Sequence, residues 1–429
     1  MTTLALTVPR LPRPWSDKKG RFHGLRAAVF ALLLLPGLAV AGRWAADALG
    51  AEPAKAALKE VGFWATWILL ASLAVSPAKA VLGLPGLVVV RRMIGLGALA
   101  YALLHLLLYV VHQNWRVLHV VGEIALRFYL TVGFVALVGL AVLGWTSSDE
   151  WVRRLGKRWK RLHKWVYLLA ALAVLHFYLQ SKLDVSRAVL VSGVFVWLML
   201  WRLLPAGRDR ELPALLGLAV ASAALTLGME FAWYALATKA DPWRVFWGEF
   251  DIAFGLRPAG QVLALGLLVA AAVALRRLAQ SAHTGPTHTG AAWVAVAVST
   301  GGGGIAYGVL YALNLLPDLE LLGLEDGAAR FVTGVWLALF GLLGLARWRL
   351  AQAWQRRWVN VLWAAWALYP LYGWQMDRPE VVLAGSAAVG LAALAVSARL
   401  WPVSRPAALL LAPVVAWVAY AATALLERV

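Results

Sequence analysis

The sequence predicts an all-α polytopic membrane protein with about 13 transmembrane helices, and three observations support this fold class. The chain of 429 residues is 62% hydrophobic and 14% charged, whereas soluble domains are about 45–50% apolar and about 25% charged. Apolar runs close to the roughly 20 residues that a spanning helix needs recur along the whole chain. The 24 tryptophans fit the aromatic belts of a protein that crosses the membrane many times.

The net charge of +19 reflects membrane topology rather than nucleic-acid binding, because the basic residues cluster between the apolar runs. With the basic tail at 1–25 in the cytoplasm, the loops that contain Arg91 and Arg92, Arg153–Arg161 and Arg202–Arg210 lie on the same side. We therefore expect a cytoplasmic N-terminus and contact with membrane lipid. We expect no cleavable signal, since the first apolar run is longer than a signal core. The absence of cysteine excludes thiolate haem ligation, iron–sulfur clusters and thiol catalysis.

The apolar runs fall into three groups. After a cytoplasmic tail at 1–25, six runs are expected in a first domain at 26–205, and two additional helices at 206–280. A linker at 281–289, rich in Gly, Pro and Thr, breaks helical structure, and five further spans are expected at 290–429. No internal repeat is evident. The individual spans are expected at 26–43, 61–84, 93–112, 123–144, 163–181, 187–204, 213–236, 259–276, 290–313, 330–348, 357–375, 380–399 and 406–426.

Two histidines in the first domain are candidate haem ligands, since histidine is a usual axial ligand of haem iron. His105 and His176 each lie about 13 residues past the start of an outward-running helix, so both are expected about 20 Å from the inner surface. Two histidines at matched depth on neighbouring helices can hold one haem between them. The alternative is that both are hydrogen-bonded polar residues of a bundle, although an ionisable residue inside a span is functional by default. His112, seven residues past His105 on nearly the same face, is the rival ligand.

The inner end of the same helices carries a different set of residues. His163 lies about 20 Å from His176 along the helix, which is a suitable separation for a second haem. The position thirteen residues before His105, however, is Arg92, which disfavours a second bis-histidine site. A basic inner pocket for haem propionates or for the phosphate of a flavin nucleotide is expected instead, and ordinary positive-inside charge is the alternative explanation. The residues of this pocket are Arg91, Arg92, Arg161 and His163.

Three further features of the apolar runs are candidate sites. Arg127 forms an i, i+4 pair with Glu123 and either reaches a haem propionate or only anchors its helix. Glu230 is expected near the outer interface, where snorkelling is favoured over proton or quinone handling. The run Gly301–Gly304 is expected to permit close helix packing rather than to bind phosphate. No catalytic triad or zinc-binding motif is readable.

Several separated motifs of the first domain match one known family. They are Arg91–Leu96 followed by His105, Glu123–Thr131, Thr146-Ser147, and Leu155–His163 continuing to His176. In these motifs residues 26–205 resemble the MsrQ (YedZ) family, haem-binding membrane subunits of a methionine sulfoxide reductase system within the ferric-reductase-like transmembrane group. Some members of that family also carry two extra spans like those at 213–276.

The resemblance implies a six-helix b-type cytochrome of the bacterial inner membrane, with haem b and, by family attribution, FMN. The family's histidines carry over onto His105, His163 and His176. Electrons would come from a cytoplasmic flavin reductase or from the quinone pool. They would pass outward to a periplasmic molybdopterin-dependent subunit that reduces methionine sulfoxide in proteins. The chain would then be an electron-transfer subunit with no catalytic residue of its own.

The last five spans resemble a second family, the tryptophan-rich sensory (TspO) proteins, which bind tetrapyrroles. The motifs that carry this resemblance are Trp336 with Gly341 and Gly344, then Asn360–Trp363, Ser404–Leu410 and Pro413–Tyr420. Two alternatives to an electron conduit therefore remain. One is a tetrapyrrole-binding transporter or sensor that acts through the five-helix bundle, and the other is a direct transmembrane ferric reductase. The bundle could also serve only stability or assembly.

Overall fold

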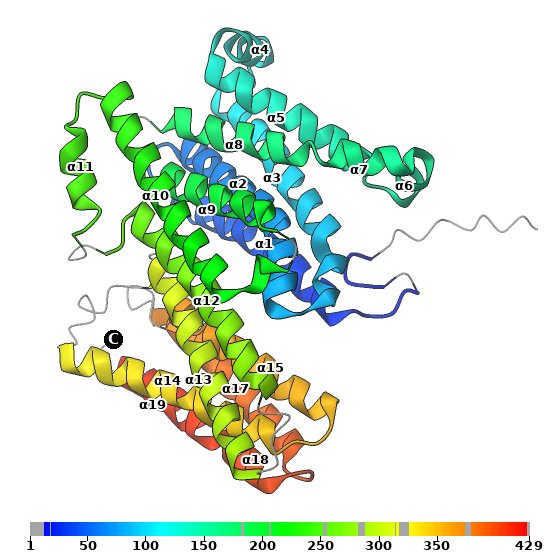
Figure 1. Ribbon diagram of the computed structural model, residues 1–429, viewed down its shortest axis with the longest axis vertical. Helices are drawn as coiled ribbons and strands as arrows, with labels where there is room; N and C mark the ends of the chain where they lie inside the picture. The colour runs from blue at the N-terminus through cyan, green and yellow to red at the C-terminus, as the bar shows by residue number, and fades with distance from the viewer. Residues whose placement is uncertain are drawn as a thin grey trace, which may run out of the picture. The chain divides into compact units, whose positions relative to one another are not determined.

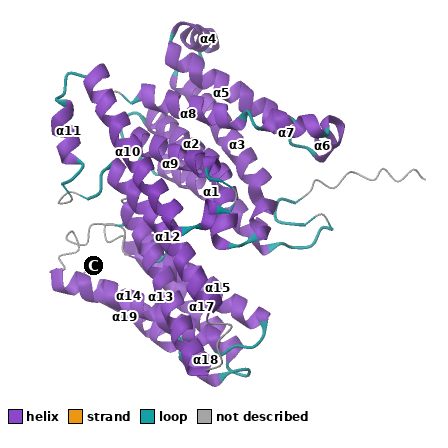
Figure 2. Ribbon diagram, in the orientation of Figure 1, coloured by secondary structure: helices purple, strands orange, loops and turns teal. Residues whose placement is uncertain are grey.

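The computed structural model describes residues 13–17, 19–181, 184–205, 207–251, 255–281, 288–313, 315–316, 326–373 and 379–426. Helices make up most of these ranges (Figure 2), and within them the β-structure is limited to an isolated bridge between Ser16 and Phe22. The all-α fold class expected from the sequence is confirmed.

The chain divides into two compact units. The first unit comprises Met1–Leu204 and Leu225–Pro242, and the second comprises Pro205–Ala224 and Trp243–Val429. The helix α10 (Leu212–Ala237) contributes to both. The other helices of the first unit (Figure 1) are α1 (Gly24–Ala45), α2 (Pro53–Leu82), η1 (Pro85–Val90), α3 (Arg91–His112), α4 (Val117–Leu126), α5 (Phe128–Trp145), α6 (Asp149–Leu155), α7 (Lys157–His163), α8 (Val166–Gln180) and α9 (Ser186–Leu203).

The second unit begins with η2 (Arg208–Arg210) and continues with nine helices among its described residues. They are α11 (Pro242–Gly248), α12 (Pro258–Ser281), α13 (His288–Ala312), α14 (Asp326–Trp348), α15 (Ala353–Ala367), α16 (Pro370–Gly373), α17 (Pro379–Leu400), α18 (Arg405–Leu409) and α19 (Ala412–Leu426). Within this unit α13 packs against α12 and α14, and α17 packs against α19.

Twelve helices among the described residues are long and apolar enough to cross a membrane, so the chain is a multi-pass membrane protein. The expected span at 357–375 corresponds to α15, of 15 residues, and the four-residue α16. Proline lacks a backbone N–H and is favoured in the first turn of a helix, so Pro370 separates the two. The expected span at 123–144 likewise begins only at Phe128, after the short apolar helix α4.

In two helices of the first unit, a side chain from another helix bonds backbone groups that lack their usual partner within the helix. Pro77 lies inside α2 and cannot donate to the carbonyl of Leu73. Arg202 Nη2 on α9 donates to that carbonyl at 2.6 Å. In α1, the backbone N–H of Gly37 donates to the hydroxyl of Tyr101, a residue of α3, at 2.7 Å. The same hydroxyl donates to the Leu33 carbonyl of α1 at 2.7 Å. These insertions tie α9 to α2 and α3 to α1.

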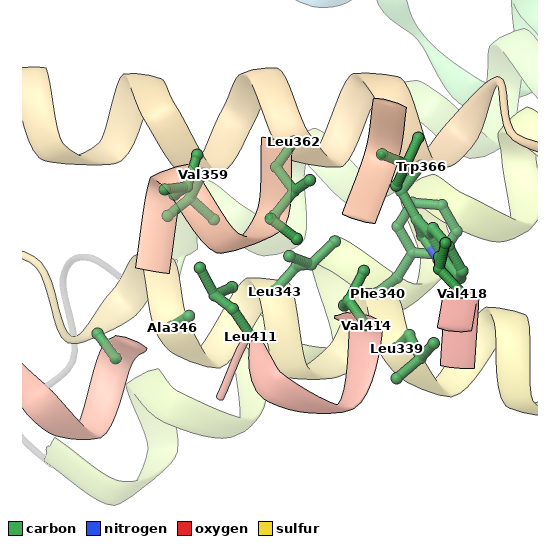
Figure 3. Close-up of a cluster of buried hydrophobic side chains, with 14 of the residues drawn as sticks. Leu339, Phe340, Leu343, Ala346, Val359, Leu362, Trp366, Leu411, Val414 and Val418 are labelled. Carbon is green, nitrogen blue, oxygen red and sulfur yellow. The ribbon is translucent and has the colours of Figure 1, made fainter. Parts of the chain in front are cut away.

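The centre of the second unit is filled by large side chains from α14, α15 and the α18–α19 segment (Figure 3). Trp336 and Trp366 are both fully buried, and each indole N–H donates to the other residue's carbonyl, at 3.2 and 3.1 Å. Gly301 packs against Leu275 and Gly303 against Phe340, which agrees with the expected close packing of this glycine run.

Candidate functional site

The fold of the first unit brings the rings of His105 and His176 together. His105 lies on α3 and His176 on α8, and their ring centroids are 6.3 Å apart with the ring planes at 82°. Both side chains are half-buried. His112, the rival candidate, is the last residue of α3 and lies about 10 Å farther along the helix axis. The geometry thus favours His105 over His112 as the partner of His176.

Each ring is held by a backbone carbonyl through Nδ1. His105 Nδ1 lies 2.9 Å from the carbonyl oxygen of Leu58 on α2, and His176 Nδ1 lies 2.7 Å from that of Tyr129 on α5. A carbonyl only accepts hydrogen bonds, so Nδ1 carries the proton in each ring and Nε2 keeps its lone pair. This is the arrangement by which proteins orient a histidine for metal ligation.

Each ring also lies against a glycine one turn beyond its carbonyl. A Cβ atom on Gly62 would lie 2.6 Å from His105 Nδ1, and a Cβ on Gly133 would lie 2.6 Å from His176 Nδ1. A side chain at either position would therefore force the histidine ring to shift. Neither glycine is among the site residues expected from the sequence. A glycine inside an apolar helix signals close approach of a neighbour, but that signal does not identify the neighbour.

The two histidine sites are copies of one local arrangement. In both, the hydrogen bond joins residues 47 positions apart, and the helices concerned pack as pairs, α2 with α3 and α5 with α8. The expectation of no internal repeat is therefore wrong, because three positions recur at an interval of 71 residues. They are Leu58, Gly62 and His105 in the first copy and Tyr129, Gly133 and His176 in the second.

Aromatic residues that follow Gly62 and His176 in the sequence pack on each other. Phe63 follows Gly62 and Phe177 follows His176, and their rings meet edge to face at 6.3 Å. The guanidinium of Arg187, at the start of α9, lies 5.2 Å above the Phe63 ring. These contacts join α2, α8 and the start of α9.

His163 is held differently. Its Nε2 lies 3.2 Å from the hydroxyl of Thr146, whose own proton is directed to the Val142 carbonyl at 2.8 Å. The ring stacks on Trp159 with centroids 4.0 Å apart. The hydroxyl therefore accepts from His163, so Nε2 carries the proton and the lone pair is on Nδ1. Ligation by His163 stays a prediction.

The basic residues expected around His163 are partly engaged by other groups. Arg92 Nη2 forms an ion pair with Asp149 at 2.6 Å, while Arg91 is half-buried and Arg161 is exposed. Arg91 and Arg92 lie near enough to His163 to act on it electrostatically. A basic inner pocket formed by these residues stays a prediction.

Arg127 immediately precedes α5, at the end of that helix which carries Tyr129. Its guanidinium lies 2.6 Å from the Glu123 carboxylate and 3.1 Å from the Tyr129 hydroxyl. The hydrogen bond to Tyr129 and then the one to Glu123 raise the pKa of Arg127, so it is cationic at any physiological pH. Tyr129 is also the residue whose carbonyl holds His176. Arg127 is therefore adjacent to the site, and its contact with a propionate stays a prediction.

Glu230 does not snorkel to the interface as expected. Its side chain on α10 is only 1% exposed. The neighbouring Met229 carbonyl accepts a hydrogen bond from the Tyr178 hydroxyl at 3.3 Å, and the Tyr178 and Trp233 rings meet at 4.9 Å. Tyr178 of α8 therefore packs on α10 beside the buried carboxyl, and the sequence of α10 alone does not predict that packing.

Comparison with known proteins gives consistent matches to this part of the chain. Residues 61–174, which contain His105 and end two residues before His176, match the family model described as ferric reductase like transmembrane component. The heme-binding subunit MsrQ of protein-methionine-sulfoxide reductase from Rhodospirillum rubrum is 42% identical over 188 residues, which are 43% of this chain and 90% of that protein. The subunit of the same name from Caulobacter vibrioides is 41% identical over 167 residues, which are 38% of this chain and 79% of that protein.

The subunit of that name from Xanthomonas campestris pv. campestris is 40% identical over 159 residues, 36% of this chain and 72% of that protein. No solved structure matches the chain. The relatives are thus aligned over most of their own length, and more than half of this chain lies outside each of these alignments. The chain belongs to the MsrQ family, the heme-binding subunits of protein-methionine-sulfoxide reductase.

Proposed function

We propose that this chain holds haem b between His105 and His176 and carries electrons across the membrane to a partner that reduces methionine sulfoxide in proteins. The observation that carries the proposal is the 6.3 Å separation of the two rings. An imidazole nitrogen bonds a first-row metal ion at about 2 Å, so two rings on opposite sides of one ion have centroids about 6 Å apart.

The chemistry of the donors also suits a haem. The imidazoles of His105 and His176 would hold the haem iron, since histidine is a usual ligand of haem. The carbonyls of Leu58 and Tyr129 take the Nδ1 protons, which leaves both Nε2 atoms available. The bound haem would supply one-electron redox chemistry, and the chain supplies orientation, burial and two ligands.

The position of the pair along the helices supports outward delivery of electrons. His176 lies four residues before the end of α8, and Tyr129 is the second residue of α5. At about 1.5 Å per residue, the His176 site is about 6 Å from those helix ends. With a cytoplasmic N-terminus, these ends would face the periplasm. The relatives are named as subunits of a protein-methionine-sulfoxide reductase, and we place the reductase partner on this side. We propose a molybdopterin-dependent subunit there.

The electron donor would act at the opposite, inner end. The basic residues Arg91, Arg92 and Arg161 support a cytoplasmic flavin reductase, or FMN bound through its phosphate, as the donor. Oxidation of quinol from the membrane pool is the alternative. The bacterial inner membrane is the compartment in which both donors and a periplasmic acceptor are accessible to one protein.

The test is a spectrum of the purified full-length protein. We expect a b-type Soret band, reversible reduction by dithionite and one haem per chain. Protein that binds no haem when expressed with ample haem supply would overturn the proposal. Two haems per chain would instead assign His163 as a ligand. Rapid reduction of ferric chelates by the reduced protein, with no partner present, would favour a direct ferric reductase.

A second candidate function rests on a groove in the C-terminal unit. The groove, of about 470 Å³, lies between α14 and α19 and is lined by Phe331, Val335, Leu339, Pro413, Ala416, Trp417 and Tyr420. Since side chains fill the centre of this unit, a hydrophobic tetrapyrrole would bind in the groove. Quenching of tryptophan fluorescence by protoporphyrin that is lost in Trp417→Ala but kept in His105→Ala would support this TspO-like function.

A further inference from the structure

We infer that the hairpin of α6 and α7 is a docking surface for the headgroups of anionic phospholipids. This basic hairpin, residues 149–164, connects the inner ends of α5 and α8 (Figure 1). It lies outside the histidine pair, and the inference does not depend on haem binding.

The hairpin presents a dense positive charge. Seven of its 16 residues are lysine or arginine, and all seven side chains are exposed: Arg153, Arg154, Lys157, Arg158, Lys160, Arg161 and Lys164. Its acidic residues are Asp149 and Glu150, and Asp149 is in an ion pair with Arg92 at 2.6 Å. Clusters of four to eight lysines and arginines beside a membrane span are typical of binding to anionic lipid.

Two tryptophans indicate the level of the hairpin in the membrane. Trp145 is the last residue of α5 and is 74% exposed, and Trp165 immediately precedes α8 and is 58% exposed. Exposed tryptophans at the ends of spans lie at the interface between headgroups and acyl chains. The chain therefore leaves and re-enters the apolar layer at these residues, and the hairpin between them lies at headgroup level.

The hairpin is held in a fixed conformation. Gly156, with φ +50°, makes the turn between α6 and α7. The Trp159 indole N–H donates to the Thr146 carbonyl at 2.9 Å, and the Arg154 guanidinium lies 5.1 Å above the Trp151 ring. These contacts anchor the aromatic side chains of the hairpin and leave its charges exposed. Basic residues interleaved with tryptophan on short helices favour a lipid surface over a protein partner.

The experiment uses the full-length protein in bilayers that contain spin-labelled phosphatidylglycerol or spin-labelled phosphatidylcholine. We expect the motionally restricted fraction to be larger for phosphatidylglycerol, and this preference to weaken as salt rises from 50 to 500 mM. Each basic residue near an anionic surface contributes about fivefold to binding. The triple variant Arg153→Gln, Lys157→Gln, Arg158→Gln should therefore lose at least about tenfold of the preference.

The matched control removes three charges at the opposite end of the bundle, in Lys55→Gln, Lys59→Gln, Arg116→Gln, and should keep the preference. Equal restriction of both lipids by the unaltered protein would overturn the inference, as would an equal loss in the two triple variants. Retained lipid preference with lost electron transfer from a soluble flavin reductase would also overturn it and would assign the hairpin to a protein partner. If the hairpin triple variant does not fold, the salt dependence of the unaltered protein decides.

Discussion

The repeated helix pair has a proposed outer end, at His105 and His176, and a proposed inner end, at Arg92 and His163. The two ends contain equivalent positions but have different chemistry. At the outer end, the interval of 71 residues relates His105 to His176, and both rings are held through Nδ1 by a carbonyl. At the inner end the same interval relates Arg92 to His163. There the arginine pairs with Asp149, and the histidine is held through Nε2 by a hydroxyl.

The difference shows that the hydrogen-bond partner decides what a membrane histidine offers to a ligand. A carbonyl at Nδ1 leaves Nε2, the more accessible nitrogen, with its lone pair. A threonine hydroxyl whose proton is already directed to Val142 takes the Nε2 proton instead. His176 thus keeps on Nε2 the lone pair that a metal would need, whereas the His163 ring packs on Trp159, although only 13 residues separate the two histidines.

The largest expected effect comes from removing either outer ring. His105→Ala and His176→Ala should each abolish haem binding, because a single axial imidazole leaves the iron without its second protein ligand. His163→Ala should retain about one haem per chain, as should His112→Ala. The haem-to-protein ratio, from pyridine haemochrome absorbance, measures this. Loss of haem in His163→Ala with retention in His176→Ala would reverse the assignment of the two ends.

The next largest effect concerns the glycines. Gly62→Ala and Gly133→Ala each place a methyl group about 2.6 Å from an Nδ1 atom, so the ring must move off its carbonyl. A lost outer hydrogen bond of a metal ligand typically costs 10–100-fold in affinity. Haem retention should fall by at least about tenfold in both variants. Electron paramagnetic resonance should also show altered ligand-plane angles in any haem that remains.

The matched controls for the glycine variants are Gly95→Ala and Gly122→Ala, where an added Cβ meets open space. Both should bind haem like the unaltered protein. A normal haem ratio and spectrum in Gly133→Ala would show that the carbonyl bond does not position His176.

A smaller effect is expected at Arg127. If its guanidinium binds a propionate in addition to Glu123, Arg127→Gln should speed haem transfer to apomyoglobin by about two- to fivefold, the value of an exposed ion pair of up to about 1 kcal/mol. Glu123→Gln removes the same 2.6 Å pair but no propionate contact, and should leave the transfer rate unchanged. Equal effects of the two substitutions would confine Arg127 to anchoring the helix.

The smallest expected effect on haem tests the inner end. Thr146→Val removes the hydroxyl that accepts from His163 and should lower the free energy of unfolding by about 1 kcal/mol, since the group is buried. The Soret band and the haem ratio should not change, and thermal denaturation followed by both tryptophan fluorescence and Soret absorbance separates the two effects. A changed haem spectrum in Thr146→Val would indicate that His163 touches a cofactor after all.

The sequence predicted the fold class and His105 with His176, because apolar runs, basic loops and matched helix depth are all local or periodic signals. It did not predict Gly62 and Gly133 as part of the site. Their role depends on which helices pair, and α2 with α3 and α5 with α8 are pairings that hydropathy does not encode. The repeat was also hidden, because a backbone carbonyl can come from any residue, and here Leu58 in one copy corresponds to Tyr129 in the other.

The hydrogen bond from Arg202 to the Leu73 carbonyl of α2 restricts the order in which residues 77 and 202 can be substituted. While Pro77 is present, Arg202→Leu leaves the Leu73 carbonyl without this hydrogen-bond donor. The substitution should lower the free energy of unfolding by about 1–3 kcal/mol. With alanine at position 77 the backbone N–H returns, and the same replacement should be nearly neutral at this carbonyl. A change to proline at 77 should therefore cost less in a chain that already carries the arginine. A descendant that loses the arginine first would pass through a destabilised intermediate, so the two positions form an epistatic pair with a preferred direction.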